Sequence, residues 1–166
     1  MKCLIVYYSL DENTSAAAER IAEKTGFDAV RIESVKRLPR STFLKLIVGG
    51  GQVTAGKRPE LEILPIDPDL YDVIILGTPV WADKCAAPVY SFISSIKDHS
   101  RIKAVFTLSA GGDNEKCLKQ LEKLNADILA SVSLYDRRSK NASLNDARID
   151  EFSSKLAELF PCDREE

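Results

Sequence analysis

Short, continuous runs of apolar residues punctuate the chain and predict strands. Five such runs stand out, the last with the weakest pattern: Lys2–Tyr8, Val73–Gly77, Ile102–Leu108, Asp127–Leu134 and Ala29–Glu33. The strongest of them are rich in Ile, Val and Leu, and they lack the apolar–polar alternation of a sheet with one solvated face. We therefore expect strands that are covered on both faces.

Between these runs, apolar residues recur every three or four positions, which predicts amphipathic helices. The segments with this spacing are Thr14–Lys24, Pro88–Ile96, Asn114–Leu124 and Asp146–Phe160. Residue types that commonly cap a helix stand near three of the expected starts: Thr14 or Asn13, Asp113, and Asn145 or Asp146.

Strands that alternate with helices imply right-handed crossovers and a parallel sheet. The expected fold class is therefore α/β, a doubly wound parallel sheet of five strands, in one domain over residues 1–160 with a short tail at 161–166. Residues 35–72 supply the second crossover, with an apolar helix near Thr42–Val48, the glycines of Gly49–Gly51 and a proline-punctuated connection.

Composition and charge exclude several classes of protein. The formal net charge of −2 over 166 residues leaves no basic footprint for nucleic acid. No apolar run approaches the roughly 20 residues of a membrane span. Lys2 and the apolar run after it look like the start of a secretory signal, but Asp11 and Glu12 interrupt the segment where the apolar stretch would continue. We expect a cytoplasmic protein with neither a nucleic-acid nor a membrane partner.

The cysteines and the histidine offer little catalytic chemistry. The four cysteines form no CxxC pair, so neither a metal site nor a disulfide framework is expected. His99 is the only histidine, which argues against a His-paired catalytic cysteine, and we assign no catalytic residue. Two interpretations of Cys85 stay open: a small buried hydrophobe, or a reactive thiol beside a site.

One segment approaches the spacing of a phosphate-binding P-loop. Gly51 and Gly56-Lys57 stand at the right separation, but Arg58 replaces the Ser or Thr that would hold Mg²⁺. The segment also follows an apolar helix and runs into Pro59, whereas a P-loop leaves a strand and opens a helix. Helix termination and a turn explain these glycines better.

The turn after the first strand, Ser9–Thr14, is a stronger candidate for a ligand site. Open α/β sheets bind ligands outside the carboxyl ends of their strands, where the strand order reverses. The start of the following helix offers unpaired N–H groups and the positive end of the helix dipole to an anion. Asn13 or Thr14 as a simple helix cap is the competing explanation.

Two further segments reach the same edge of the sheet. Thr78–Asp83 follows the strand at Val73–Gly77 and contains Trp81, and Ser109–Gly112 follows the next strand. A loop tryptophan at this place can stack on a planar ligand, although burial in the core would also explain it. Gly111 and Gly112 allow a close approach of the backbone to a ligand, or they only turn the chain.

Together these segments resemble the flavodoxin family, and the resemblance covers most of the chain. The matching stretches are Ile5–Ser9 with Asn13-Thr14, Gly56–Leu61, Leu76–Ala82 and Ser109–Gly112, of which Leu76–Ala82 is the most specific. The resemblance implies a sheet in the order 2-1-3-4-5, in the short-chain type of the family, and non-covalent binding of FMN. The stretch around Gly56–Leu61 looks like the subset with an extended second crossover.

The family pattern assigns the cofactor-binding residues by loop. The first loop would hold the phosphate, and the second and third would hold the isoalloxazine ring, with Trp81 against it. The residues so assigned are Ser9, Leu10, Asp11, Glu12, Asn13, Thr14, Thr78, Pro79, Val80, Trp81, Ala82, Ser109, Ala110, Gly111 and Gly112.

The sequence departs from the family at three acidic positions. Asp11 replaces a threonine and Glu12 a glycine in the phosphate loop, and Asp83 stands where a glycine is common. We expect a positive φ at Glu12. An acidic pair after the first strand also occurs in phosphate-accepting receiver domains, but those carry an aspartate where this chain has Gly77-Thr78.

The resemblance implies electron transfer through FMN, by a carrier or by a small FMN-dependent oxidoreductase with a nicotinamide or quinone partner. The expected partners are a redox protein or a small-molecule electron acceptor, with the chain a monomer or homodimer. The alternative is a flavodoxin-like domain that has lost FMN, through Asp11 and Glu12, and acts as a binding module.

Overall fold

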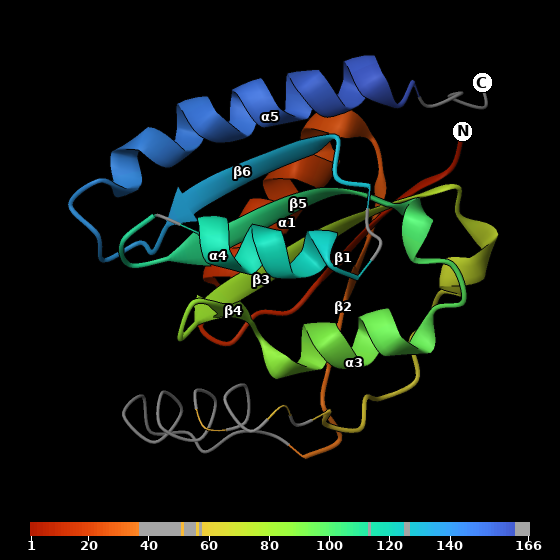
Figure 1. Ribbon diagram of the computed structural model, residues 1–166. Helices are drawn as coiled ribbons and strands as arrows, with labels where there is room; N and C mark the ends of the chain where they lie inside the picture. The colour runs from red at the N-terminus through yellow and green to blue at the C-terminus, as the bar shows by residue number, and fades with distance from the viewer. Residues whose placement is uncertain (37–50, 52–55, 57, 113, 125–126, 162–166) are drawn as a thin grey trace.

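The computed structural model describes residues 1–36, 51, 56, 58–112, 114–124 and 127–161 (Figure 1). Five parallel strands form the sheet in the order β2-β1-β3-β5-β6. The strands are β1 (Cys3–Tyr7), β2 (Asp28–Arg31), β3 (Val73–Trp81), β5 (Ile102–Ser109) and β6 (Ala130–Tyr135), and a short β4 (Lys84–Cys85) pairs antiparallel with β3. The predicted order of five parallel strands, 2-1-3-4-5, is thus confirmed, with one short strand added.

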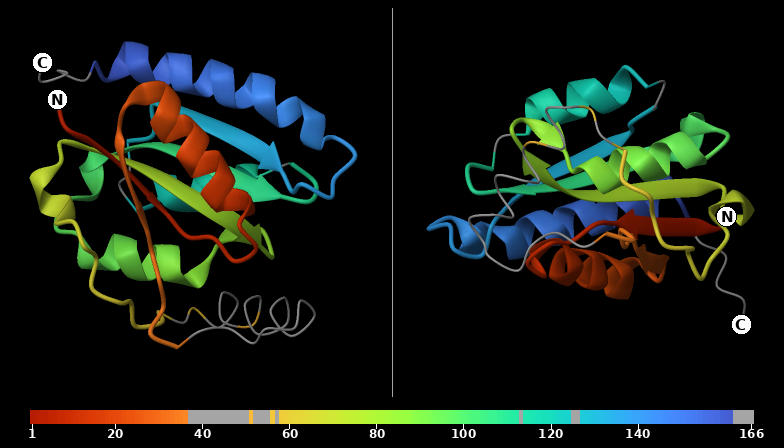
Figure 2. Two further views of the ribbon diagram at one scale, coloured as in Figure 1. Left: turned by 180° about the vertical axis from the view of Figure 1, so that it is seen from behind. Right: turned by 90° about the horizontal axis from the view of Figure 1, so that it is seen from below.

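Helices cover both faces of this sheet (Figures 1 and 2). They are α1 (Asn13–Thr25), α3 (Ala87–Ser95), α4 (Glu115–Glu122) and α5 (Asn145–Leu159), with 3₁₀ turns at Pro68–Leu70, His99–Arg101 and Ala142–Leu144. α1 and α5 pack together on one face, while α3 and α4 lie on the other. Within the described residues, no helix is long and apolar enough to cross a membrane.

Two separate hydrophobic cores explain why the strands lack alternation. Along β1, Cys3, Ile5 and Tyr7 face the core beneath α1 and α5, whereas Leu4 and Val6 face the core beneath α3 and α4. All five residues are buried. A strand with a core on each side must be apolar at every position, which is the pattern that the sequence presents.

The helix starts differ from the expected caps. Glu12, not Asn13 or Thr14, precedes α1, and its side chain makes no capping hydrogen bond. The Asn145 side chain pairs with the backbone N–H and C=O of Tyr135, and α5 begins after Leu144. The Asn145 amide is thus engaged by the last residue of β6, a partner that local helix propensity does not register. Asp113 and the helix expected near Thr42–Val48 lie outside the described residues.

β3 extends beyond its predicted end at Gly77. It continues to Trp81 and turns back into β4 through Ala82 and Asp83, whose φ values are 48° and 63°. Positive φ at both central residues is what a tight type I′ hairpin turn requires. Trp81 is therefore the last residue of a paired strand and not a loop residue, although it still lies at the carboxyl edge.

Gly77 lets the sheet close around an aromatic ring. A Cβ atom at this position would lie 2.2 Å from the Phe106 ring on the adjacent strand β5. The glycine in an otherwise bulky strand thus makes room for Phe106, which is fully buried in the core beneath α1 and α5.

We expect Gly77→Ala to destabilise the protein by about 1–3 kcal/mol, since the added methyl group must displace a ring in a packed core. Urea denaturation of the purified variant measures the change. Gly111→Ala is the matched control, because no atom lies within 4 Å of a Cβ placed there. Equal stability of the two variants would contradict this account of Gly77.

Candidate functional site

A cleft of about 210 Å³ opens at the carboxyl edge of the sheet, between the ends of β1, β3, β5 and β6. Its lining consists of Ser9, Leu10, Asp11, Asn13, Thr14, Pro79, Val80, Trp81, Leu108, Ser109, Ala110 and Asp136. The structure thus brings all three predicted loops together at one cleft. Of the residues expected at the site, Glu12, Thr78, Ala82, Gly111 and Gly112 do not line it.

The first loop ends in a helix start that can receive an anion. The N–H groups of Ser15 and Ala16 bond to Ser9 Oγ (3.2 Å) and to the Glu12 carbonyl (3.0 Å). Within the described part of the chain, no acceptor pairs with the N–H groups of Asn13 and Thr14 or with the Thr14 hydroxyl. Those donors remain at the cleft, at the positive end of α1.

The side-chain amide of Asn13 makes a hydrogen bond within the protein. Its Nδ2 donates to Asp136 Oδ2 at 2.8 Å, so this side chain ties the first loop to the residue after β6. Sequence reasoning missed Asp136 and Leu108 as lining residues. The available signal for Asp136 was its position directly after the last strand, at the same edge as the other loops.

Glu12 has the positive φ expected at this position, 61°, and its side chain stays out of the cleft. A non-glycine residue in this left-handed conformation costs of order 1–2 kcal/mol. The carboxylate pairs with Arg31, its two oxygens lying 3.0 and 3.2 Å from Arg31 Nη1. The charge of Glu12 is thus compensated on the outer side of the loop.

Trp81 forms one wall of the cleft and is braced from behind by Tyr8. The two rings meet edge to face, with centroids 5.8 Å apart and an interplanar angle of 88°. Burial, with the nearby Glu33 carboxylate next, raises the pKa of Tyr8 to about 12, so its hydroxyl stays neutral at physiological pH. The partly exposed indole is therefore held by a neutral ring at the point where a planar ligand could stack.

Thr78 positions the second loop and does not line the cleft. It is fully buried, its hydroxyl accepts from the Ala86 N–H at 3.0 Å, and it donates to the Pro79 carbonyl at 2.8 Å. These bonds fasten the hairpin that carries Trp81 to the start of α3. Asp83, at the hairpin tip, pairs with Lys116 of α4 at 2.8 Å and does not line the cleft.

The third loop turns tightly at its glycines. Ser109 Oγ accepts from the Gly112 N–H at 2.9 Å, and Gly112 has a φ of 72°. A Cβ at Gly112 would lie 2.2 Å from the Tyr135 ring. Turn geometry and the packing of Tyr135 therefore explain Gly112, while Ser109 and Ala110 reach the cleft.

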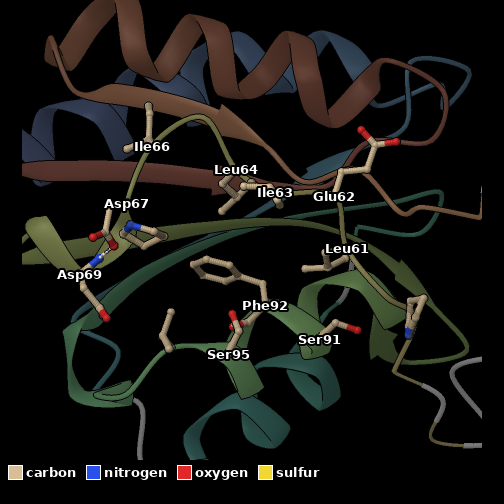
Figure 3. A pocket seen from close by; sticks show the side chains of 13 residues that line it. Leu61, Glu62, Ile63, Leu64, Ile66, Asp67, Asp69, Ser91, Phe92 and Ser95 are labelled. Carbon is tan, nitrogen blue, oxygen red and sulfur yellow. Dashed lines mark hydrogen bonds between the residues drawn. The ribbon is translucent and has the colours of Figure 1, made fainter.

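A second, larger hollow of about 530 Å³ lies between residues 59–69 and α3 (Figure 3). Phe92 and Ser95 of α3 face Leu61, Leu64 and their neighbours across it. It shares no lining residue with the cleft at the strand ends. No sequence pattern pointed to this hollow, because the wall that faces α3 is an irregular segment without periodicity.

The Cys85 thiol is a buried packing group, which resolves the choice left open by the sequence. It is the last residue of β4 and is fully buried, hydrogen-bonded to Cys117 of α4 and within reach of the Tyr90 hydroxyl. Burial raises its pKa well above the usual value, so the reactive thiolate is suppressed.

We expect Cys85 to resist alkylation in the folded protein and to react readily in urea, because unfolding removes the desolvation that keeps the thiol protonated. Mass spectrometry of the peptide containing Cys85, after timed exposure to iodoacetamide at pH 8, measures both rates. Rapid native labelling of Cys85 would show that the thiol is exposed and activated after all.

No protein-family model matches the sequence, and no curated protein matches it. Several solved structures of other proteins have a fold similar to that of this chain. A flavoprotein from Lactobacillus acidophilus NCFM, crystallised in complex with FMN, is 21 % identical with a TM-score of 0.70, over 92 % of this chain and 98 % of that one.

A flavodoxin from the domain Archaea is 14 % identical with a TM-score of 0.58, over 96 % of this chain and 98 % of that one. The WrbA-like flavodoxin from Agrobacterium tumefaciens is 17 % identical with a TM-score of 0.55, over 95 % and 98 %. The chain therefore has the flavodoxin-like fold, as the sequence resemblance implied.

Proposed function

We propose that this chain binds FMN non-covalently in the cleft at the carboxyl edge of the sheet and serves in electron transfer. The observation that carries the proposal is the convergence of three separate loops on that cleft, with free helix N–H groups at one end and an indole at the other. The fold it shares with an FMN-bound flavoprotein supports the same assignment.

The first loop supplies donors suited to a phosphate group. The N–H groups of Asn13 and Thr14 and the Thr14 hydroxyl lie at the start of a helix of 13 residues, whose dipole favours an anion. Asp11 and Asp136 also line this cleft and oppose a dianion there. The donor set fits a phosphate, at an affinity that the two carboxylates reduce.

The other end of the cleft suits a planar ring. Leu10, Val80, Trp81 and Leu108 provide apolar walls, and the backbone of Ser109 and Ala110, which also line the cleft, would address the polar edge of the ring. FMN supplies the exchange of one or two electrons, and the protein tunes it by stacking and nearby charge. Because ligand pockets usually measure roughly 300–1,000 Å³, a cleft of about 210 Å³ would leave part of the ring open to a redox partner.

The partner of this flavin is a redox protein or a small-molecule acceptor, and the chain works as a monomer or homodimer in the cytoplasm. An electron carrier and a small FMN-dependent oxidoreductase with a nicotinamide or quinone partner both fit this proposal. The cleft holds no side chain pair arranged as an acid–base or nucleophilic unit among the described residues, so the flavin would do the chemistry.

A second candidate function is a flavodoxin-like binding module without FMN. The acidic character of the phosphate end favours it, since Asp11 and Asp136 face the cleft and Glu12 lies just outside. In that case the cleft would take a ligand without a phosphate group, or a protein partner.

FMN titration of the purified protein separates the two. Trp81 is the only tryptophan, so we expect saturable quenching of its fluorescence as FMN binds beside it. At a free FMN concentration 100 times the Kd, binding adds about 2.7 kcal/mol to stability, which corresponds to a rise in Tm of roughly 5–10 °C.

Trp81→Phe is the control: it should remove the fluorescence signal while keeping a rise in Tm with FMN. A wild-type protein that is colourless and neither quenches nor gains thermal stability with excess FMN would overturn the FMN proposal and favour the binding module.

A further inference from the structure

One guanidinium holds the first loop at both of its ends. Arg31 is the last residue of β2 and pairs in register with Tyr7, so it lies beside the point where β1 gives way to the loop. Its Nη2 donates to the Ser9 carbonyl at 2.9 Å, and its Nη1 donates to both oxygens of Glu12. The contacts therefore join the residue that opens the loop to the residue that precedes α1.

We call the contacts of Arg31 with Ser9 and Glu12 the clamp, and its Glu12 end has the strained backbone. Glu12 adopts φ 61° and ψ 0°, and its carbonyl accepts the Ala16 N–H as the first turn of α1 closes. The same left-handed residue sets the direction of the next two N–H groups, those of Asn13 and Thr14. A glycine would hold this conformation without help, whereas glutamate lacks that freedom.

Arg31 also faces a second carboxylate, that of Glu33 just after β2. Its Nε lies 3.2 Å from Glu33 Oε1, an ion-pair contact without hydrogen-bond geometry, and its side chain is 31 % exposed, compared with 63 % for Glu12. Arg31 is therefore the more buried partner of its pair with Glu12. Arg31 does not line the cleft, so any effect on a ligand there acts through the loop.

We propose that Arg31 is the positioning residue of the anion-binding loop: its bonds to Ser9 and Glu12 hold Glu12 in the left-handed conformation that aims the Asn13 and Thr14 N–H groups at the cleft. The ligand part of this inference rests on the proposed binding of FMN, while the clamp itself is a property of the free protein. The pairing also explains how a glutamate can occupy this position with its charge directed away from the anion.

The test is a double-mutant cycle of Arg31→Gln and Glu12→Gly, with FMN and riboflavin as probes. Riboflavin lacks the phosphate, so it reports ring binding alone. We expect Arg31→Gln to weaken FMN binding about tenfold, equivalent to about 1.4 kcal/mol, and riboflavin binding less than twofold. In the Glu12→Gly background, Arg31→Gln should weaken FMN binding less than threefold, because glycine needs no clamp.

Two further variants separate positioning from charge. Arg31→Lys should restore only part of the FMN affinity, since one ammonium group cannot reproduce the two-pronged contact. Arg20→Gln removes an equal charge from an arginine that pairs with Asp146, and it should leave FMN affinity unchanged.

Amide hydrogen exchange on the ligand-free proteins tests the clamp without FMN. Exchange of the amides of Ser15 and Ala16, which donate to Ser9 Oγ and to the Glu12 carbonyl, should accelerate at least fivefold in Arg31→Gln and remain near the wild-type rate in the double variant. If the wild type binds no FMN, the proposed function fails, and exchange alone decides the clamp. Unchanged exchange in Arg31→Gln, or equal losses of FMN affinity with and without Glu12→Gly, would overturn the clamp.

Discussion

The burial of the sheet on both faces is the constraint from which the rest of the structure follows. Each central strand must satisfy two cores at once, and β1 does so by sending alternate apolar side chains to opposite sides. Helices must then cross from one strand to the next above or below the sheet, so the strands run parallel. Their carboxyl ends consequently meet at one edge, where β1, β3, β5 and β6 form the cleft.

Several acidic residues lie at that edge, and the partner of each carboxylate decides whether it faces the cleft. Glu12 is drawn outward by Arg31, Asp83 pairs with Lys116, and Asp136 accepts from the Asn13 amide. These contacts place two of the carboxylates outside the cleft and tie the third to the loop that it borders. The electrostatic character of the cleft is thus decided by partners that α1, β2 and α4 supply, and the loop sequence alone does not reveal it.

The wall that carries Trp81 is fixed by contacts that never reach the cleft. The buried Thr78 hydroxyl holds the start of α3, and the hairpin turn closes with positive φ at Ala82 and Asp83. Tyr8 supports the indole edge to face. Two of these supports, Thr78 and Tyr8, are buried in the interior, where they resemble ordinary core residues.

The pattern of the sequence by itself determined the α/β class, the parallel sheet and the edge at which the loops meet, and the family resemblance supplied the strand order. Apolar runs such as Val73–Gly77 predict strands buried on both faces, and periodic segments such as Asp146–Phe160 predict helices. Both patterns can be seen in the sequence because they depend on residues that are neighbours along the chain. Position after a strand was enough to predict Ser9, Thr14 and Trp81 at one cleft.

Only the tertiary structure decided which side chains face that cleft and what the others do. Asn13 is the first residue of α1 rather than its cap, and its side chain donates to Asp136, 123 residues away. The Thr78 side chain points inward and accepts a hydrogen bond from the Ala86 N–H. The Glu12 side chain points away from the cleft and pairs with Arg31 on the strand next to β1. Each of these outcomes depends on a partner brought close by the fold, and a linear pattern carries no record of such distances.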